Sequence, residues 1–156
     1  MRIGRQFHTS DIRDRDEICV PAGRGATAFV DAVDVGAVAA TALLDPAGHR
    51  CRAWTITGPE ALNYAQVAAI LSQILGRPIC YSRPGVLRYM RHACSQLGMP
   101  WGMVAVTSAI YTTARLGLAD DLTDQVEELL GRPATSFATF AAREKAVWSR
   151  SNQRAD

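Results

Sequence analysis

Short extended apolar runs alternate with helical stripes over the first half of the chain. Between residue 34 and residue 45, and again over 67–75, apolar residues recur at helical spacing, which predicts two amphipathic helices. Four runs rich in β-branched, aromatic or other apolar residues predict short strands: 17–20, 26–31, 53–57 and 79–82. The pattern over residues 26–84 therefore predicts a β–α–β–α–β unit.

Capping residues set the expected ends of these helices. Asp34 is the expected N-cap of the first helix, which ends before Pro46. Asn63 with Gln66 three residues later forms a capping-box pattern at the start of the second. Gly76 stops that helix, as glycine commonly does at a helix C-terminus.

After Pro84 the pattern predicts helices only. Strands joined by helical crossovers need not be hairpin partners, so we expect at least part of the sheet to be parallel. The fold class is therefore α/β, with a small sheet, crossover helices and a C-terminal helical cluster. We expect a single domain over residues 1–150, with a sheet-containing part at about 17–84, a helical lobe at about 85–150 and a frayed tail at 151–156.

Composition and charge exclude several classes of protein. The 156 residues carry a net charge of +2 and no basic stripe interleaved with aromatic residues, which argues against nucleic-acid binding. Residues 92–114 contain no charged side chain, but Gly98, Pro100 and Gly102 interrupt them, so we expect a buried helix rather than a membrane span. The polar N-terminus does not resemble a signal peptide, and a cytoplasmic protein is expected.

Cysteine and histidine spacing gives no metal site. The four cysteines form no CxxC pair, and we expect free thiols, with Cys19 and Cys80 in the core because they lie in strand-like runs. His49 lies in a polar turn and His92 on a polar helix face. We expect both histidines to be solvated rather than to be ligands.

Some patterns resemble catalytic or cofactor-binding motifs, but none has the residues or the structural context that the chemistry needs. Residues 23–28 fit G-x-G-x-x-A, but a strand is predicted to follow where dinucleotide binding needs a helix. Tyr111 has Arg115 four residues later, whereas the tyrosine–lysine pair of short-chain dehydrogenases needs a lysine. Asp31 and Asp34 flank a strand end and are interpreted as capping residues rather than as an acid–base pair. We therefore assign no catalytic, cofactor-binding or metal-binding residue.

Three separated segments resemble NmrA-like proteins, which are atypical short-chain dehydrogenase/reductase members of the NAD(P)-binding Rossmann group. They are AFVDAVDVGAVAATAL (28–43), WTITGPEALNYAQVAAILSQILGRPI (54–79) and DQVEELLGRPATSFATF (124–140). The resemblance covers about residues 8–148 and corresponds to the C-terminal half of a family that is roughly twice as long. It implies an oxidoreductase-type fold for which NAD(P) is the cofactor, with the glycine-rich loop in the N-terminal half.

The resemblance also suggests a substrate pocket. The helical lobe of the family faces the substrate, so the charge-free segment supplies the candidates Met99, Trp101, Met103 and Tyr111. A second set lies near the family's cleft: Gln6, Phe7 and His8. Core packing is the alternative for the methionine and aromatic residues.

Two functional hypotheses follow, and a degenerate gene product is a third. The first is the substrate lobe of an NmrA-like protein that binds a small molecule but neither binds NAD(P) nor transfers hydride alone. The second is a non-enzymatic interaction or regulatory module. Because a small sheet leaves an edge unpaired, such a module would form a homodimer or pair with a separate Rossmann-type chain.

Overall fold

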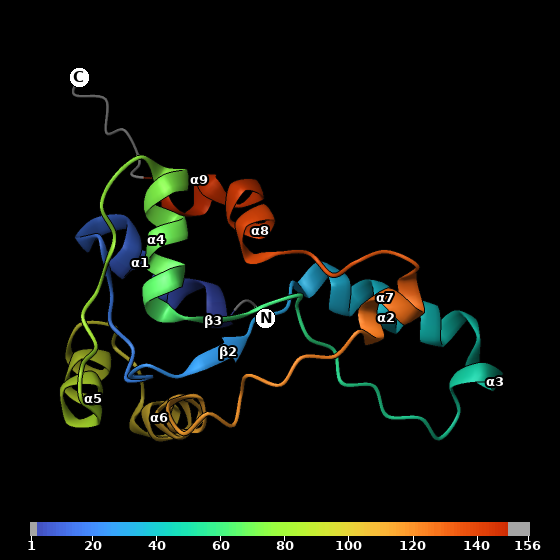
Figure 1. The fold of residues 1–156 in the computed structure, drawn as a ribbon. Helices are drawn as coiled ribbons and strands as arrows, with labels where there is room; N and C mark the ends of the chain where they lie inside the picture. The colour runs from blue at the N-terminus through green and yellow to red at the C-terminus, as the bar shows by residue number, and fades with distance from the viewer. Residues whose placement is uncertain (1–2, 150–156) are drawn as a thin grey trace.

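A computed structural model describes residues 3–149 of the chain, and side chains from residue 9 onward (Figure 1). The helices are α1 (Ile3–Arg15), α2 (Ala32–Leu44), α3 (Pro46–His49), α4 (Tyr64–Leu75), α5 (Val86–Ser95), α6 (Trp101–Arg115), α7 (Gln125–Leu130), α8 (Phe137–Arg143) and α9 (Lys145–Trp148). The strands are β1 (Glu17–Ile18), β2 (Ala26–Ala28), β3 (Ala61–Asn63) and β4 (Cys80–Tyr81). The predicted tail at 151–156 lies outside the described residues.

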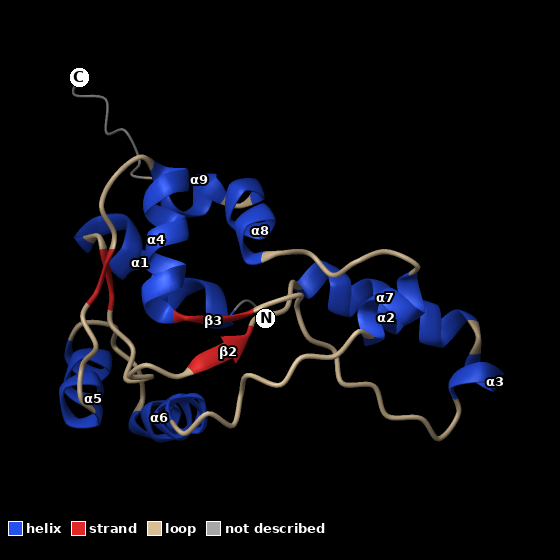
Figure 2. Ribbon diagram, viewed as in Figure 1, coloured by secondary structure: helices blue, strands red, loops and turns tan. Residues whose placement is uncertain are grey.

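The strands form two separate pairs (Figure 2). β1 and β4 run parallel, with Glu17 opposite Cys80, and more than sixty residues of chain separate them. β2 and β3 run antiparallel, with Ala26 opposite Asn63. The predicted α/β class with a small, partly parallel sheet is thus confirmed.

The strand predicted at 53–57 is wrong, and β3 lies farther along the chain. Residues 55–57 form hydrogen bonds with residues 123–125 instead of pairing with a neighbouring strand. The Thr123 hydroxyl donates to the Thr55 carbonyl at 2.5 Å, and the Thr123 N–H donates to the Thr57 hydroxyl at 2.9 Å. The Thr55 N–H donates to the Gln125 side chain. Residues 53–57 therefore serve as an anchor for the start of α7.

The N-cap of α2 also differs from the prediction. Asp31, not Asp34, has the extended backbone of an N-cap (φ −74°, ψ 132°), and its side chain accepts from the Val33 N–H at 3.0 Å. Asp34 consequently lies in the first helical turn, where its carboxylate is buried. The predicted capping box at α4 is confirmed with both reciprocal bonds present, as is the left-handed Gly76 (φ 67°) at its end.

Two apolar clusters hold these elements together. In the larger, α4 packs against α8, α9 and β4, and its Leu71 is almost fully buried. The smaller joins α5 to α6 around Tyr89 and Val104. Tyr111 of α6 packs against both clusters and so connects them. α2 packs instead against α7, at the end of the molecule that also carries α3.

The charge-free segment and the cysteines can now be located. Residues 92–114 are divided between α5 and α6, and in the part of the chain that is described no helix is long and apolar enough to cross a membrane. All four thiols are free, as predicted, and Cys19 is buried. The core position predicted for Cys80 is wrong, because this residue of the short strand β4 is exposed.

Candidate functional site

A cavity of about 230 Å³ lies between the helices of the larger cluster and β1. Aromatic side chains form much of its wall: Phe29, Tyr64, Tyr111, Phe137, Phe140 and Trp148. Aliphatic side chains form most of the rest: Ile12, Ile18, Val20, Val67, Leu71 and Val147. Thr9 and Glu144 also line it, so an apolar cavity carries a few polar groups, as ligand sites commonly do.

The aromatic rings meet edge to face, although they come from distant parts of the chain. Phe29, just after β2, contacts Tyr64 at the start of α4 with ring centroids 5.6 Å apart and an interplanar angle of 85°. Tyr64 in turn contacts Tyr111 at 6.1 Å and 75°. Since edge-to-face contacts stabilise ring pairs, the two tyrosines and Phe29 form a defined wall. The ring of Phe137 in α8 lies 5.6 Å from that of Phe29, at an interplanar angle of 50°.

The two tyrosines of this wall are neutral phenols. Burial raises the pKa of Tyr64 well above its ordinary value, and the nearby Tyr81 phenol adds to the shift. Burial likewise raises the pKa of Tyr111, with a further contribution from Tyr64. A phenol with so high a pKa stays protonated, so it can orient a ligand by hydrogen bonding but cannot act as a base at neutral pH.

The residues predicted for a substrate pocket are divided among several places. Tyr111 lines the cavity. Met99 is buried, and Met103 packs beside it in the smaller cluster. Trp101, at the first position of α6, is 66% exposed. The backbone of Gln6, Phe7 and His8 belongs to α1, and their side chains lie outside the described part of the structure.

Most of the aromatic wall was missed by sequence reasoning. Phe29, Tyr64 and the three C-terminal aromatic residues were assigned to strand or helix packing, or not singled out. Because these residues are far apart in the sequence, the sequence alone does not show that they lie close together in the fold. The one available signal was that Phe137 and Phe140 are three residues apart, and so share one face of a helix.

The glycine turn at 23–25 does not fit a dinucleotide phosphate. β2 follows it where a helix would be needed, as the sequence predicted. A methyl group at Gly25 would lie 1.8 Å from the Ala114 carbonyl oxygen, so the end of α6 already occupies that side of the turn. Arg115 packs beside Gly23, with its Cγ 3.3 Å from where a Cβ would stand. The turn therefore lacks both the space and the following helix that a dinucleotide phosphate needs.

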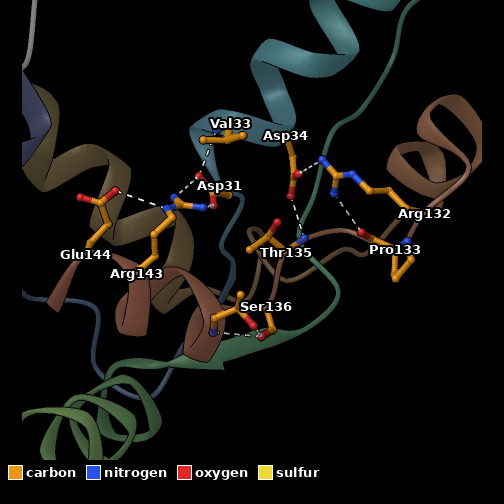
Figure 3. A network of polar contacts seen from close by, with 10 residues as sticks. Asp31, Val33, Asp34, Arg132, Pro133, Thr135, Ser136, Arg143 and Glu144 are labelled. Atoms are coloured by element: carbon orange, nitrogen blue, oxygen red, sulfur yellow. Dashed lines mark hydrogen bonds and ion pairs between the residues drawn. The ribbon is translucent and has the colours of Figure 1, made fainter.

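Asp31 and Asp34 form hydrogen bonds and ion pairs with residues of the segment 132–143, beside the cavity (Figure 3). Asp31 accepts from Arg143 at 3.0 Å. Asp34 accepts from the Arg132 guanidinium and from the Thr135 N–H, each at 2.7 Å. Because Arg132, Thr135 and Arg143 bracket the segment that carries Phe137 and Phe140, these contacts position part of the aromatic wall.

The same contacts keep both carboxyls ionised. The Arg143 guanidinium holds the pKa of Asp31 below its ordinary value, although burial opposes the shift. Burial alone would raise the pKa of Asp34, but the hydrogen bonds from Thr135 and Arg132 outweigh it and lower this pKa too. These pKa values and partners agree with the interpretation of the two residues as structural rather than as an acid–base pair.

The prediction that both histidines are solvated is wrong for His92. His92 Nε2 lies 2.8 Å from Asp11 Oδ2, and the two side chains are only 10% and 3% exposed. The helical spacing placed His92 on a polar face but could not show that α1 covers that face. His49 is partly buried, with its ring 5.6 Å from that of Trp54. Among the side chains of residues 9–149, which the structure describes, no group of His, Cys, Asp and Glu could hold a metal ion.

The fold is that of about half of a Rossmann-like reductase. An NADPH-dependent quinone oxidoreductase from Escherichia coli superposes with a TM-score of 0.78 at 23% identity, over 86% of this chain and 48% of that one. A triphenylmethane reductase from Citrobacter, in complex with NADP(H), gives 0.75 at 21% identity, over 90% and 47%. At such identities the likeness shows the fold.

Among proteins of known function, the chain is homologous to NAD(P)H-dependent oxidoreductases. It is 37% identical to an NAD(P)H azoreductase from Xenophilus azovorans, over 91% of this chain and 49% of the relative. It is 32% identical to a festuclavine synthase from Penicillium roqueforti, over 88% and 47%. The chain thus spans about half the length of the curated relatives it matches. No family model matches it.

Proposed function

We propose that this chain is the substrate-side, C-terminal portion of an NmrA-like NAD(P)H-dependent oxidoreductase. Its aromatic cavity binds a flat, conjugated electron acceptor, while the dinucleotide is bound by a glycine-rich loop outside the chain. The observation that carries the proposal is the cavity wall formed by Phe29, Tyr64, Tyr111, Phe137 and Trp148. Aromatic side chains bind a planar aromatic molecule through favourable ring contacts, and these contacts require no charge.

The size and chemistry of the cavity define the acceptor further. About 230 Å³ is smaller than the usual site of a drug-sized ligand, so a molecule of one or two rings fits best. The neutral phenol of Tyr64, which lies against the Tyr111 ring, suits a carbonyl, quinone or azo group that accepts a hydrogen bond. The names of relatives and structural neighbours point in the same direction, since they include an azoreductase and a quinone oxidoreductase.

The direct test follows tryptophan emission while 1,4-naphthoquinone is added. Trp148 lines the cavity, so a bound quinone quenches its fluorescence to saturation. Val147→Phe adds volume to the cavity wall and should weaken binding, whereas Ala146→Phe adds the same side chain at an exposed position and should not. Equal quenching in the two variants, with circular dichroism confirming that both fold, would show that the quinone binds elsewhere and would refute the proposal.

The cofactor part has its own measurement. Gly25 is packed against α6, and β2 follows the turn, so the chain alone should not bind the dinucleotide part of NAD(P)H. Isothermal titration of the chain with NADH, which carries no phosphate monoester, tests this. Binding tighter than millimolar would refute the proposal that the dinucleotide is bound outside this chain. It would leave the proposal for the substrate cavity unaffected.

A second candidate function is an interaction module that pairs with a separate Rossmann-type chain or with a second copy. It is favoured by the two-residue parallel pair β1–β4, since parallel sheets are almost always larger and covered on both faces. Large apolar side chains are also exposed on α2 and α6: Val33, Leu43, Leu44, Val106 and Ile110. Light scattering tests this candidate, and a monomer at high concentration that takes up no Rossmann-type chain would exclude it.

A further inference from the structure

A second hollow, of about 410 Å³, shares none of its lining residues with the aromatic cavity. The glycine turn that carries Gly23 and Arg24 forms one side. The start of α4, including Asn63 and Gln66, forms another, and Arg83 from the loop after β4 completes the lining. The lining of this hollow is more polar than that of the aromatic cavity, which suits a different kind of ligand.

Positive charge dominates the lining. Arg24 and Arg83 both contribute to it, and no aspartate or glutamate does so among the described residues. A third guanidinium is near, because the stem of Arg115 packs against Gly23. In the part of the chain that is described, none of these three arginines forms an ion pair, whereas Arg77, Arg132 and Arg143 each do.

The charges of Arg83 and Arg115 both act on Tyr81, next to the glycine turn. Burial raises the pKa of its phenol, and the charges of Arg83 and Arg115 both act against that shift. The Tyr81 hydroxyl itself donates to the Val20 carbonyl at 3.0 Å, just before the glycine turn. Positive charges around one hollow with no carboxylate partner favour the uptake of an anion.

The backbone of Arg83 is strained. Its φ of 47° lies in the left-handed region, which is unfavourable for a side chain other than glycine. A proline follows it and restricts its backbone further. Such strain persists where surrounding structure or function maintains it, and here it places an arginine, not a glycine, at the edge of the hollow.

We propose that this hollow binds the phosphate group of a small ligand, with Arg24 and Arg83 as its direct partners and Arg115 adding positive charge. A guanidinium offers two parallel N–H donors that match two phosphate oxygens. The first N–H groups of α4 are not needed, since the Asn63 side chain already accepts from Ala65 and Gln66 at 3.0 Å. The hollow exceeds the size of a bare phosphate ion, so an organic phosphate monoester is favoured.

Isothermal titration of the chain with inorganic phosphate and with phenyl phosphate tests the site. Arg83→Gln and Arg24→Gln should each weaken binding by about tenfold, as expected for the loss of a charge-assisted hydrogen bond. Arg50→Gln is the matched control, because Arg50 is exposed just after α3 and lines neither cavity. Tighter binding of phenyl phosphate supports a monoester as the ligand, and equal binding supports the free ion.

Arg83→Gly separates folding from binding. Glycine adopts a φ of 47° without strain, so this variant should unfold at a higher temperature while binding phosphate about tenfold more weakly. Absence of binding by the unaltered chain, or the same loss in Arg50→Gln as in Arg83→Gln, would overturn the proposal. The site and its test are independent of the function proposed for the aromatic cavity.

Discussion

Asp31 and Arg143 form a two-point ion pair across 112 residues of sequence, with Oδ1 to Nη2 at 3.0 Å and Oδ2 to Nη1 at 2.8 Å. The carboxylate is 1% exposed and the arginine side chain 41%. Asp31 also caps α2, so one side chain begins that helix and holds the end of α8. α8 carries Phe137 and Phe140, and the pair therefore links a helix start to the wall of the aromatic cavity.

Removing the arginine should cost more stability than neutralising the aspartate. Arg143→Ala leaves a buried carboxylate without its cation, so we expect this variant to lose the more stability of the two, although water reaches the arginine and moderates the loss. Asp31→Asn removes the charge but keeps an oxygen that can cap Val33, so its loss should stay under about 1 kcal/mol. Urea unfolding monitored by circular dichroism measures both, with Arg13→Ala, in an exposed pair, as the control. The reverse order of the two losses would contradict this reading of the pair.

The lowered pKa values of Asp31 and Asp34 predict destabilisation by acid. A carboxyl whose pKa is lower in the folded than in the unfolded chain binds protons more readily when unfolded. Its contribution is therefore complete above the unfolded pKa of about 3.9 and is lost as the pH falls through the folded pKa. We expect little change in stability from these two residues between pH 7 and pH 5, and a loss below about pH 4.

The double variant Asp31→Asn, Asp34→Asn tests this assignment. Its free energy of unfolding should lie below that of the unaltered chain at pH 7, and the gap should shrink as the pH falls below about 4. Urea titrations at several pH values measure the gap. A gap that remains constant down to acid pH would assign the acid sensitivity to other groups.

How far the sequence predicted the fold depends on the range of the interactions involved. The capping box of Asn63 and Gln66 and the helix stop at Gly76 were predicted correctly, because such signals involve residues within one turn. The strand at 53–57 was wrong because its local composition favours a strand, while Thr123 and Gln125, far along the chain, hold it as a loop. Tertiary partners overrode local propensity there.

The candidate site was less predictable for the same reason. Tyr111 was singled out and lines the cavity. Its ring contacts Tyr64, which in turn contacts Phe29, and both of these lie on elements whose packing no local pattern gives. His92 illustrates the point for polar groups, since its partner Asp11 is 81 residues away. Long-range pairing of side chains has no signature in a single sequence.

The four thiols should differ in reactivity in a way that reports on the fold. Cys51 and Cys80 are exposed, while Cys19 is buried and burial raises the pKa of its thiol. Because the thiolate is the reactive species, Ellman's reagent should modify Cys51 and Cys80 first and Cys19 only on unfolding. Absorbance at native and denaturing urea concentrations counts the thiols, and Cys51→Ser with Cys80→Ser should abolish the fast phase. Rapid modification of Cys19 in the native chain would show that the region around β1 opens.

Gly25 and Gly58 should not tolerate a side chain, because each packs closely against backbone atoms, whereas Gly36 should accept one. A methyl group at Gly58 would lie 1.8 Å from the Phe29 carbonyl oxygen, and one at Gly25 would lie equally close to that of Ala114. Either alanine variant must displace backbone, so we expect losses of about 2 kcal/mol or more. Gly36 of α2 has open space around it, and Gly36→Ala should stabilise the chain by up to about 1 kcal/mol, since alanine is the better helix former. Thermal unfolding measures all three.

Because Phe29 lines the aromatic cavity, Gly58→Ala should also weaken naphthoquinone binding, whereas Gly36→Ala should leave it unchanged. Unaltered stability in Gly58→Ala would mean that the loop before β3 does not pack against Phe29 as described.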